Sequence, residues 1–91
     1  MKRIHIIISG RVQGVAFRAA TREKAISLNL SGWVKNMQDG QVEAVFEGED
    51  GQVEVMHRWC EHGPSLARVT GVNIHDEDFT GKLRNFTILR D

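Results

Sequence analysis

The stretch Ser9-Gly-Arg-Val-Gln-Gly-Val-Ala-Phe-Arg18 joins the first predicted strand of the chain to its first predicted helix. Ile4, Ile6 and Ile8 alternate with other residues before the stretch, which indicates a strand, and helical spacing of apolar residues begins at Phe17. Glycines in so short a connection allow successive N–H groups to point into one concavity, and the following helix adds the positive end of its dipole. The stretch therefore predicts a site for a small anion such as phosphate.

This connection differs from the phosphate loop of nucleotide-binding proteins. Gly10 and Gly14 are too closely spaced for that motif, and Val15, Ala16 and Phe17 stand where it has its lysine and hydroxyl residue. A tight strand-to-helix turn without any ligand also explains the two glycines. The loop taken alone leaves both interpretations open.

Length and charge restrict what the chain can be. Its 91 residues suit a single domain, residues 1–91, with one core. Lys and Arg together number 12, as do Asp and Glu, so no basic excess is present to neutralise a nucleic acid or an anionic membrane. No apolar run approaches the length of a membrane span. We therefore expect a domain that binds neither nucleic acid nor membranes.

The cysteine and the histidines give no indication of a reactive or metal-binding site. Cys60 is the only cysteine, which excludes an internal disulfide. The single cysteine and the absence of an apolar leader at the N-terminus together favour a cytoplasmic location. We interpret Cys60 as a buried apolar residue. His5, His57, His62 and His75 fall on different segments without the spacing of metal ligands, and surface positions are expected for all four. The sequence predicts no metal site.

The remaining segments complete the order strand, helix, strand, strand, helix, strand. We predict a helix over 18–29, followed by strands over 33–37 and 42–46 that are joined by Gln38-Asp39-Gly40. A second helix is predicted after Asp50 and ends at Gly63-Pro64. A strand over 67–74 with a bulge at Gly71, a polar loop over 76–84 and a last short strand over 86–88 complete the chain. This order is that of a ferredoxin-like α/β sandwich (βαββαβ) of the α+β class. Two helices would cover one face of an antiparallel sheet, with a short extra C-terminal strand.

Arg18 and Asn36 become neighbours in this topology. The first helix returns the chain to where the first strand began, so the first two strands run parallel and end at the same edge of the sheet. The arginine fork matches phosphate oxygens, and an asparagine both accepts from and donates to a water without changing charge. The pair can thus bind a phosphoryl group and place a nucleophilic water. The alternatives are a solvated Arg18 in the first helical turn and an Asn36 that serves only the end of the hairpin.

Three segments, in order and at family spacing, resemble the acylphosphatase family: GRVQGVAFR at 10–18, LNLSGWVKNMQDGQVEAVFEG at 28–48 and GPSLARV at 63–69. The resemblance implies hydrolysis of the carboxyl-phosphate bond of acyl phosphates to a carboxylate and inorganic phosphate, with no metal or organic cofactor. It implies that Arg18 clamps the phosphate and that Asn36 orients the attacking water. It further implies a phosphate cradle formed by the backbone of Gly10, Arg11, Val12, Gln13, Gly14, Val15 and Ala16.

The chain departs from the family pattern in three places. Ala16 is smaller than the residue common there, Met37 stands where threonine is common, and the C-terminal segment lacks the tyrosine that many members have near the end. We expect the first two differences to tune the rate or substrate access. The third leaves the packing of the last strand open.

The resemblance implies a small monomeric enzyme whose partners are an acyl phosphate substrate and, in the cradle, inorganic phosphate or another small anion. One alternative is a domain of a larger maturation protein that uses carbamoyl phosphate; the end of the chain after one domain favours the free enzyme. Another is a ferredoxin-like domain that binds nucleic acid or a regulatory ligand. The balanced charge and the lack of paired exposed aromatics over 42–46 disfavour that alternative.

Overall fold

Strand β1 (Lys2–Arg11) lies inside the sheet, with antiparallel partners on both sides. One partner is β3 (Val42–Gly48) and the other is β4 (Arg68–Glu77). Ile4, Ile6 and Ile8 alternate along β1 and are almost fully buried, as their two-residue period predicts. The computed structural model describes residues 1–90 of the chain.

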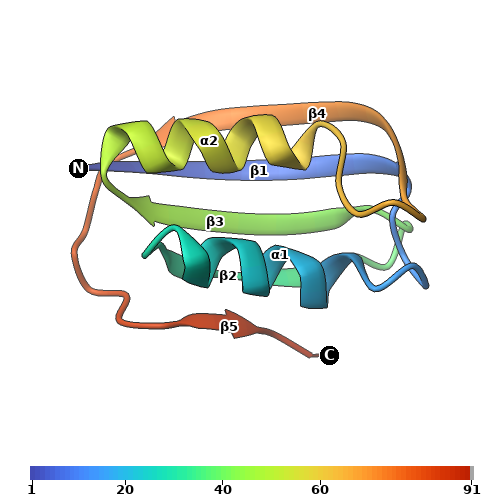
Figure 1. Ribbon diagram of the computed structural model, residues 1–91, viewed down its shortest axis with the longest axis horizontal. Helices are drawn as coiled ribbons and strands as arrows, with labels where there is room; N and C mark the ends of the chain where they lie inside the picture. The colour runs from blue at the N-terminus through green and yellow to red at the C-terminus, as the bar shows by residue number, and fades with distance from the viewer. Residues whose placement is uncertain (91) are drawn as a thin grey trace.

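The sheet has five strands in the order β4-β1-β3-β2-β5, and both helices lie on the same face of it (Figure 1). Strand β2 (Ser31–Asn36) pairs with β3 in an antiparallel hairpin. The short strand β5 (Phe86–Ile88) adds to the other side of β2 in parallel. The predicted sandwich is therefore confirmed, but the sheet is mixed rather than purely antiparallel. The chain crosses from the β4 edge of the sheet to the opposite edge before β5, and β5 then runs in the same direction as β2.

The helices cover the sheet with the residues that their spacing predicts. Helix α1 (Phe17–Ser27) buries Phe17, Thr21 and Ala25. Helix α2 (Asp50–Cys60) buries Val53, Met56 and Cys60 in the same core. Burial raises the pKa of the Cys60 thiol, which agrees with an unreactive apolar role for this residue.

Several predicted boundaries differ from the structure by one to three residues, and the pairing of the strands explains two of these differences. Strand β2 begins at Ser31, two residues before its predicted start, since its pairing with β3 starts opposite Glu47. Strand β4 continues through Glu77 into the predicted polar loop, because its backbone pairs with β1 as far as Arg3. Polar side chains are compatible with this strand, since it lies at the edge of the sheet.

The predicted bulge occurs one residue before the expected position. Ser9 pairs with Gly71 and Gly10 pairs with Val69, so Thr70 is the additional residue of β4. The irregularity lies at the end of β1 from which the chain enters the glycine-flanked connection. It therefore changes the strand pairing where that connection begins.

On the face of the sheet that carries no helix, neighbouring side chains shield part of the sheet from solvent. Val45 is 1% exposed and pairs in register with His5 and Trp33. His5 itself is only partly exposed and lies 2.6 Å from Glu43, so it is not a simple surface histidine. Glu47 is also buried on this side.

Within residues 1–90, no helix is both long enough and apolar enough to cross a membrane.

Candidate functional site

The connection between β1 and α1 has the conformation that its glycines suggested. Gly14 has a φ of 74° and Ala16 a φ of 60°, so both lie in the left-handed region, which alanine rarely adopts. Ala16 is also the N-cap of α1, where no side chain caps the helix. The connection therefore bends sharply just before the helix starts.

Backbone donors are concentrated in this bend. Within the described residues, the N–H groups of residues 13–19 donate to no backbone carbonyl and no side chain, and the first bond of this kind runs from Ala20 to Ala16. The first turn of α1 contains no acidic residue that could neutralise the positive end of its dipole. The geometry leaves several donors and a partial positive charge at one place.

Arg18 and Asn36 line the same small cavity, of about 170 Å³. Strands β1 and β2 are both antiparallel to β3, so they are parallel to each other and end at the same side of the sheet, as the topology predicted (Figure 1). Val12, Gln13, Gly14 and Ala16 of the connection line the cavity too. The structure thus brings together residues that lie far apart in the sequence.

Three residues of the expected cradle lie elsewhere. Gly10 and Arg11 are the last residues of β1 and pair with β4. A side chain at Gly10 would overlap the carbonyl oxygen of Arg68, and its φ is 121°, so the strand pairing already requires this glycine. The side chain of Val15 packs in the core. The phosphate-binding role of these three residues remains a prediction.

The carboxamide oxygen of Asn36 has an unusual environment. Oδ1 is buried and has no hydrogen-bond partner among the residues described. A buried polar atom without a partner costs about 1–3 kcal/mol, and functional sites are where such atoms persist. Its position in the cavity of Arg18 makes it an available acceptor for a water or a ligand.

Gln13 connects the bend to the β2–β3 hairpin. Its Nε2 donates to the carbonyl oxygens of Met37, at 2.8 Å, and Gln41, at 2.9 Å. Gln41 in turn donates from its side chain to Ser9 Oγ, at 2.6 Å. From the sequence, Gln13 was predicted only as part of the cradle, because no local pattern indicates which distant carbonyls a glutamine reaches.

The C-terminal segment also contributes to the cavity. Ile88 and Arg90 line it, and neither was among the predicted site residues. The available signal was the pairing of β5 with β2, which places residues after Ile88 beside the end of β2 near Asn36. The sequence leaves the packing of the last strand open, so the position of Arg90 could not be predicted from it.

The lining of the cavity is positive. It includes Arg18 and Arg90 and no acidic side chain, and within residues 1–90 neither arginine makes an ion pair. In the same part of the chain, no three His, Cys, Asp or Glu side chains gather closely enough to hold a metal ion. The arrangement can bind an anion through a guanidinium and backbone donors, and can hold a water at an amide oxygen.

Comparison with known proteins gives a consistent result. A family model described as acylphosphatase matches residues 4–88. The chain is 48% identical over 91 residues to an acylphosphatase of Methylococcus capsulatus, with 100% of this chain and 99% of the relative covered. It is 54% identical over 87 residues to an acylphosphatase of Rubrobacter xylanophilus, covering 96% of this chain and 79% of that one. The crystal structure of acylphosphatase from Bacillus subtilis superposes with a TM-score of 0.95 at 32% identity, covering 99% of this chain and 100% of that chain.

Proposed function

The chain belongs to the acylphosphatase family and is an enzyme that hydrolyses acyl phosphates, and we propose that Arg18, the free backbone donors of residues 13–16 and Asn36 carry the reaction without a metal or other cofactor. The observation that most supports this assignment is one cavity that combines Arg18 with the unpartnered, buried Oδ1 of Asn36. An arginine alone would suit any anion. The Asn36 oxygen in the same cavity can accept a hydrogen bond from a water, which a hydrolysis reaction requires.

The phosphoryl group binds at the bend before α1. Its oxygens accept hydrogen bonds from the backbone N–H groups of the connection and the first helical turn, which have no protein acceptor within residues 1–90. The Arg18 guanidinium supplies a full positive charge and a planar pair of donors. These groups hold the phosphorus in position and stabilise the charge on its equatorial oxygens as the bond to the acyl group lengthens.

Asn36 positions the nucleophile. A water that donates to Oδ1 has its oxygen lone pair free to face the phosphorus. The water oxygen forms a bond to phosphorus while the bond between phosphorus and the acyl oxygen breaks, and the acyl group leaves as a carboxylate. A phosphate oxygen of the substrate accepts the water proton, so the second product is inorganic phosphate and no protein base is needed.

This mechanism makes modest chemical demands. A carboxylate is a good leaving group, and phosphoryl transfer depends mainly on positioning and charge stabilisation. One guanidinium and a set of fixed N–H dipoles can meet these demands in a small cavity. No His, Asp or Glu side chain lies among the described residues that line the cavity, so a strong dependence of the rate on a histidine would contradict the proposal.

We further propose that the enzyme acts as a monomer in the cytoplasm, where its ligands are the acyl phosphate and inorganic phosphate or another small anion. The single cysteine, which is buried, supports a reducing compartment. Sedimentation of the purified protein at several concentrations tests the oligomeric state. A mass that doubles with concentration would contradict the monomer.

Hydrolysis of benzoyl phosphate in the presence of a chelator tests the role of Arg18. We expect the wild-type enzyme to remain active and Arg18→Ala to lose about 100-fold or more in kcat/KM, together with its affinity for inorganic phosphate. Arg58→Ala is the matched control, because Arg58 is a highly exposed arginine on α2. Equal activity of the two variants would contradict the site assignment, and loss of wild-type activity with the chelator would contradict metal independence.

A further inference from the structure

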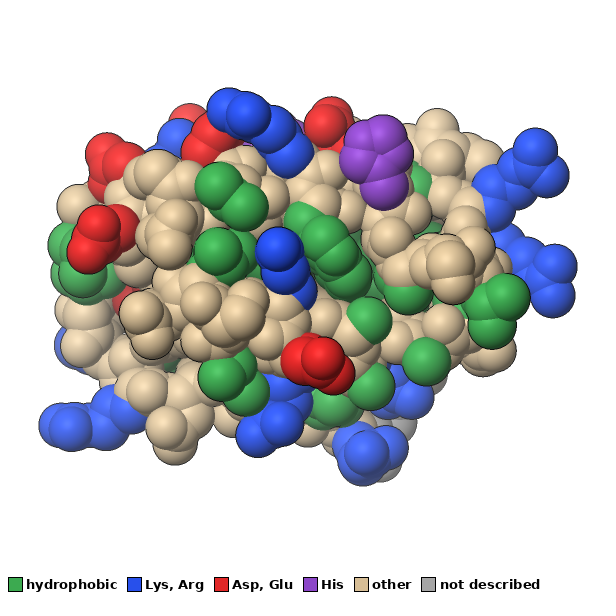
Figure 2. All heavy atoms as spheres, viewed as in Figure 1, with side chains coloured by type: hydrophobic (Ala, Val, Ile, Leu, Met, Phe, Trp, Pro, Cys, Tyr) green, Lys and Arg blue, Asp and Glu red, His purple; other side chains and the backbone are tan. Residues whose placement is uncertain are grey.

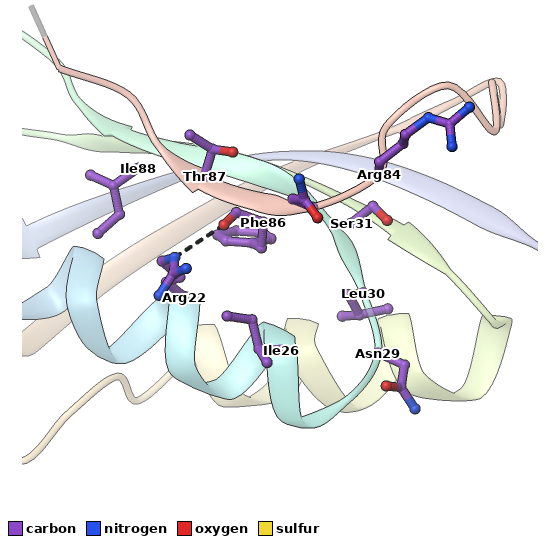
Figure 3. A pocket seen from close by; sticks show the side chains of 10 residues that line it. Arg22, Ile26, Asn29, Leu30, Ser31, Arg84, Phe86, Thr87 and Ile88 are labelled. Atoms are coloured by element: carbon purple, nitrogen blue, oxygen red, sulfur yellow. Dashed lines mark hydrogen bonds between the residues drawn. The ribbon is translucent and has the colours of Figure 1, made fainter.

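A second, larger cavity adjoins the site and has no role in the mechanism described so far. It has a volume of about 720 Å³ and lies between α1 and the segment that contains β5 (Figure 3). Ile88 lines both this groove and the small cavity of Arg18 and Asn36. The two cavities therefore meet at Ile88.

The small cavity leaves most of a substrate outside. Its volume of about 170 Å³ is below the roughly 300 Å³ at which pockets for larger organic ligands begin. A phosphoryl group and the carbonyl next to it occupy such a space. The rest of the acyl group then needs a second surface, and the groove borders the site at Ile88.

Arg22 lies along this groove at a useful distance from the phosphoryl site. It follows Arg18 by four residues, so the two arginines share a face of α1 and are about 6 Å apart along the helix axis. Figure 3 shows Arg22 beside Phe86, with Ile88 on one side of it and Ile26 on the other. A group that extends from the site past Ile88 meets Arg22 next.

The guanidinium of Arg22 is held in place but not neutralised. Its Nε donates to the carbonyl oxygen of Phe86, at 3.1 Å, while its other nitrogens donate to no acceptor within the described part of the chain. It makes no ion pair there, and no acidic side chain lines the groove. Figure 2 shows Lys and Arg side chains along the margin of the molecule where α1 and β5 lie. An anionic group is the ligand that this arrangement would recognise.

We propose that the groove binds the acyl part of the substrate and that Arg22 selects acyl groups carrying an anionic substituent, such as a second carboxylate. Ile88 contacts the hydrocarbon between the two charged ends of such a substrate, and Arg22 receives its free end. This assignment rests on the proposed function, since it takes the phosphoryl group to lie beside Arg18. It makes Arg22 a specificity residue rather than part of the hydrolytic machinery.

Two aromatic substrates of the same shape test the assignment. In 4-carboxybenzoyl phosphate the distal group is an anion, and in 4-carbamoylbenzoyl phosphate it is a neutral amide of similar size. The two acyl groups also differ as leaving groups. The readout is therefore the kcat/KM for the carboxy substrate divided by that for the carbamoyl substrate, and this ratio in each variant is compared with the ratio in the wild-type enzyme. We expect Arg22→Gln to lower this ratio about fivefold, with the carbamoyl substrate little affected.

Two further variants separate a specific contact from a general effect. Arg22→Lys keeps the charge and is expected to retain part of the preference for the carboxylate. Arg58→Gln removes an exposed charge on α2, outside the groove, and is expected to leave the ratio unchanged.

An unchanged ratio in Arg22→Gln would overturn the inference. Equal losses with both substrates would also overturn it, because they would show that Arg22 only holds β5 in place through Phe86. Failure of the proposed function has a different signature. In that case Arg18→Ala would keep its activity toward both substrates, whatever the ratio in the Arg22 variants.

Discussion

The side chain of Gln13 donates a hydrogen bond of 2.8 Å from Nε2 to the carbonyl oxygen of Met37. Met37 directly follows Asn36, so this bond joins the loop that precedes α1 to the end of β2. A second bond from the same Nε2 to Gln41 secures the return strand of the hairpin. Gln13 therefore helps to hold the loop that precedes α1 at a fixed distance from Asn36.

Gln13→Ala should impair both stability and catalysis. Loss of the donor removes one hydrogen bond from each of two carbonyl oxygens, which keep only their backbone donors Gly40 and Met37, and we expect this to lower the free energy of unfolding by about 1–3 kcal/mol. Because the loop and Asn36 are then free to drift apart, we expect kcat/KM for benzoyl phosphate to fall about tenfold or more. Urea unfolding and steady-state kinetics measure the two effects. Gln38→Ala, at an exposed turn position, serves as control, and equal behaviour of the two variants would contradict the role of Gln13.

Gly10→Ala should be among the most damaging single substitutions in the chain. The added Cβ would overlap the carbonyl oxygen of Arg68, and a φ of 121° is unfavourable for alanine. We expect the free energy of unfolding to fall by about 3 kcal/mol or more, as measured by urea unfolding. At Gly51 in α2 an added Cβ meets no atom, so Gly51→Ala should stabilise the protein by about 0.5–1 kcal/mol. A tolerated Gly10→Ala would show that β1 and β4 can separate at this point.

Acid should weaken the fold through Glu47. This carboxylate is 2% exposed and accepts hydrogen bonds from Arg3 and from both the N–H and the hydroxyl of Thr80. Burial by itself raises the pKa of Glu47, but the hydrogen bonds of Arg3 and Thr80 outweigh it and lower the pKa below its ordinary value. The ionised form therefore stabilises the folded chain.

The direction of the pH effect follows from that lowered pKa. The stabilisation by Glu47 is fully present above the pKa of an unfolded glutamate, about 4.3, and is lost as the pH falls through the lower pKa of the folded state. Glu47→Gln should cost about 2 kcal/mol at pH 7, and this difference from the wild type should shrink below about pH 4. Urea unfolding from pH 7 to pH 3 measures it. Glu49→Gln, at an exposed position, should show no such trend, and a Glu47→Gln penalty independent of pH would contradict the account.

The sequence predicted the fold well because its local signals agree with the packing. Alternating isoleucines gave β1, the helical spacing of Phe17 and Ala25 gave α1, and the turn at Asp39-Gly40 gave the hairpin. The extension of β4 through Glu77 was missed, because an edge strand can be polar and its pairing partner is not visible in its own residues.

The proximity of Arg18 and Asn36 could be predicted because topology alone decides it. Parallel strands β1 and β2 bring Arg18 and Asn36 to one cavity, and this requires only the order of the elements. The hydrogen bonds of Gln13 and the approach of Arg90 depend on side-chain reach and on the direction of β5. Neither is determined by residue spacing, so the structure was needed to find them.

The central claim is that Arg18 and the cradle bind the phosphoryl group while Asn36 acts on the water. These roles predict different losses, because only Arg18 carries charge. Asn36→Ala should retain the affinity of the wild-type enzyme for inorganic phosphate and lose about 100-fold in kcat. Asn73→Ala, an exposed asparagine on β4, is the matched control and should match the wild type in both.

The most direct measurement is therefore the dissociation constant of inorganic phosphate and the kcat for benzoyl phosphate, determined side by side for wild type and Asn36→Ala. The account predicts an unchanged dissociation constant with a kcat reduced about 100-fold. A variant that keeps its kcat would show that Asn36 does not position the water. A variant that loses phosphate affinity in proportion to kcat would show that Asn36 belongs to the binding cradle instead.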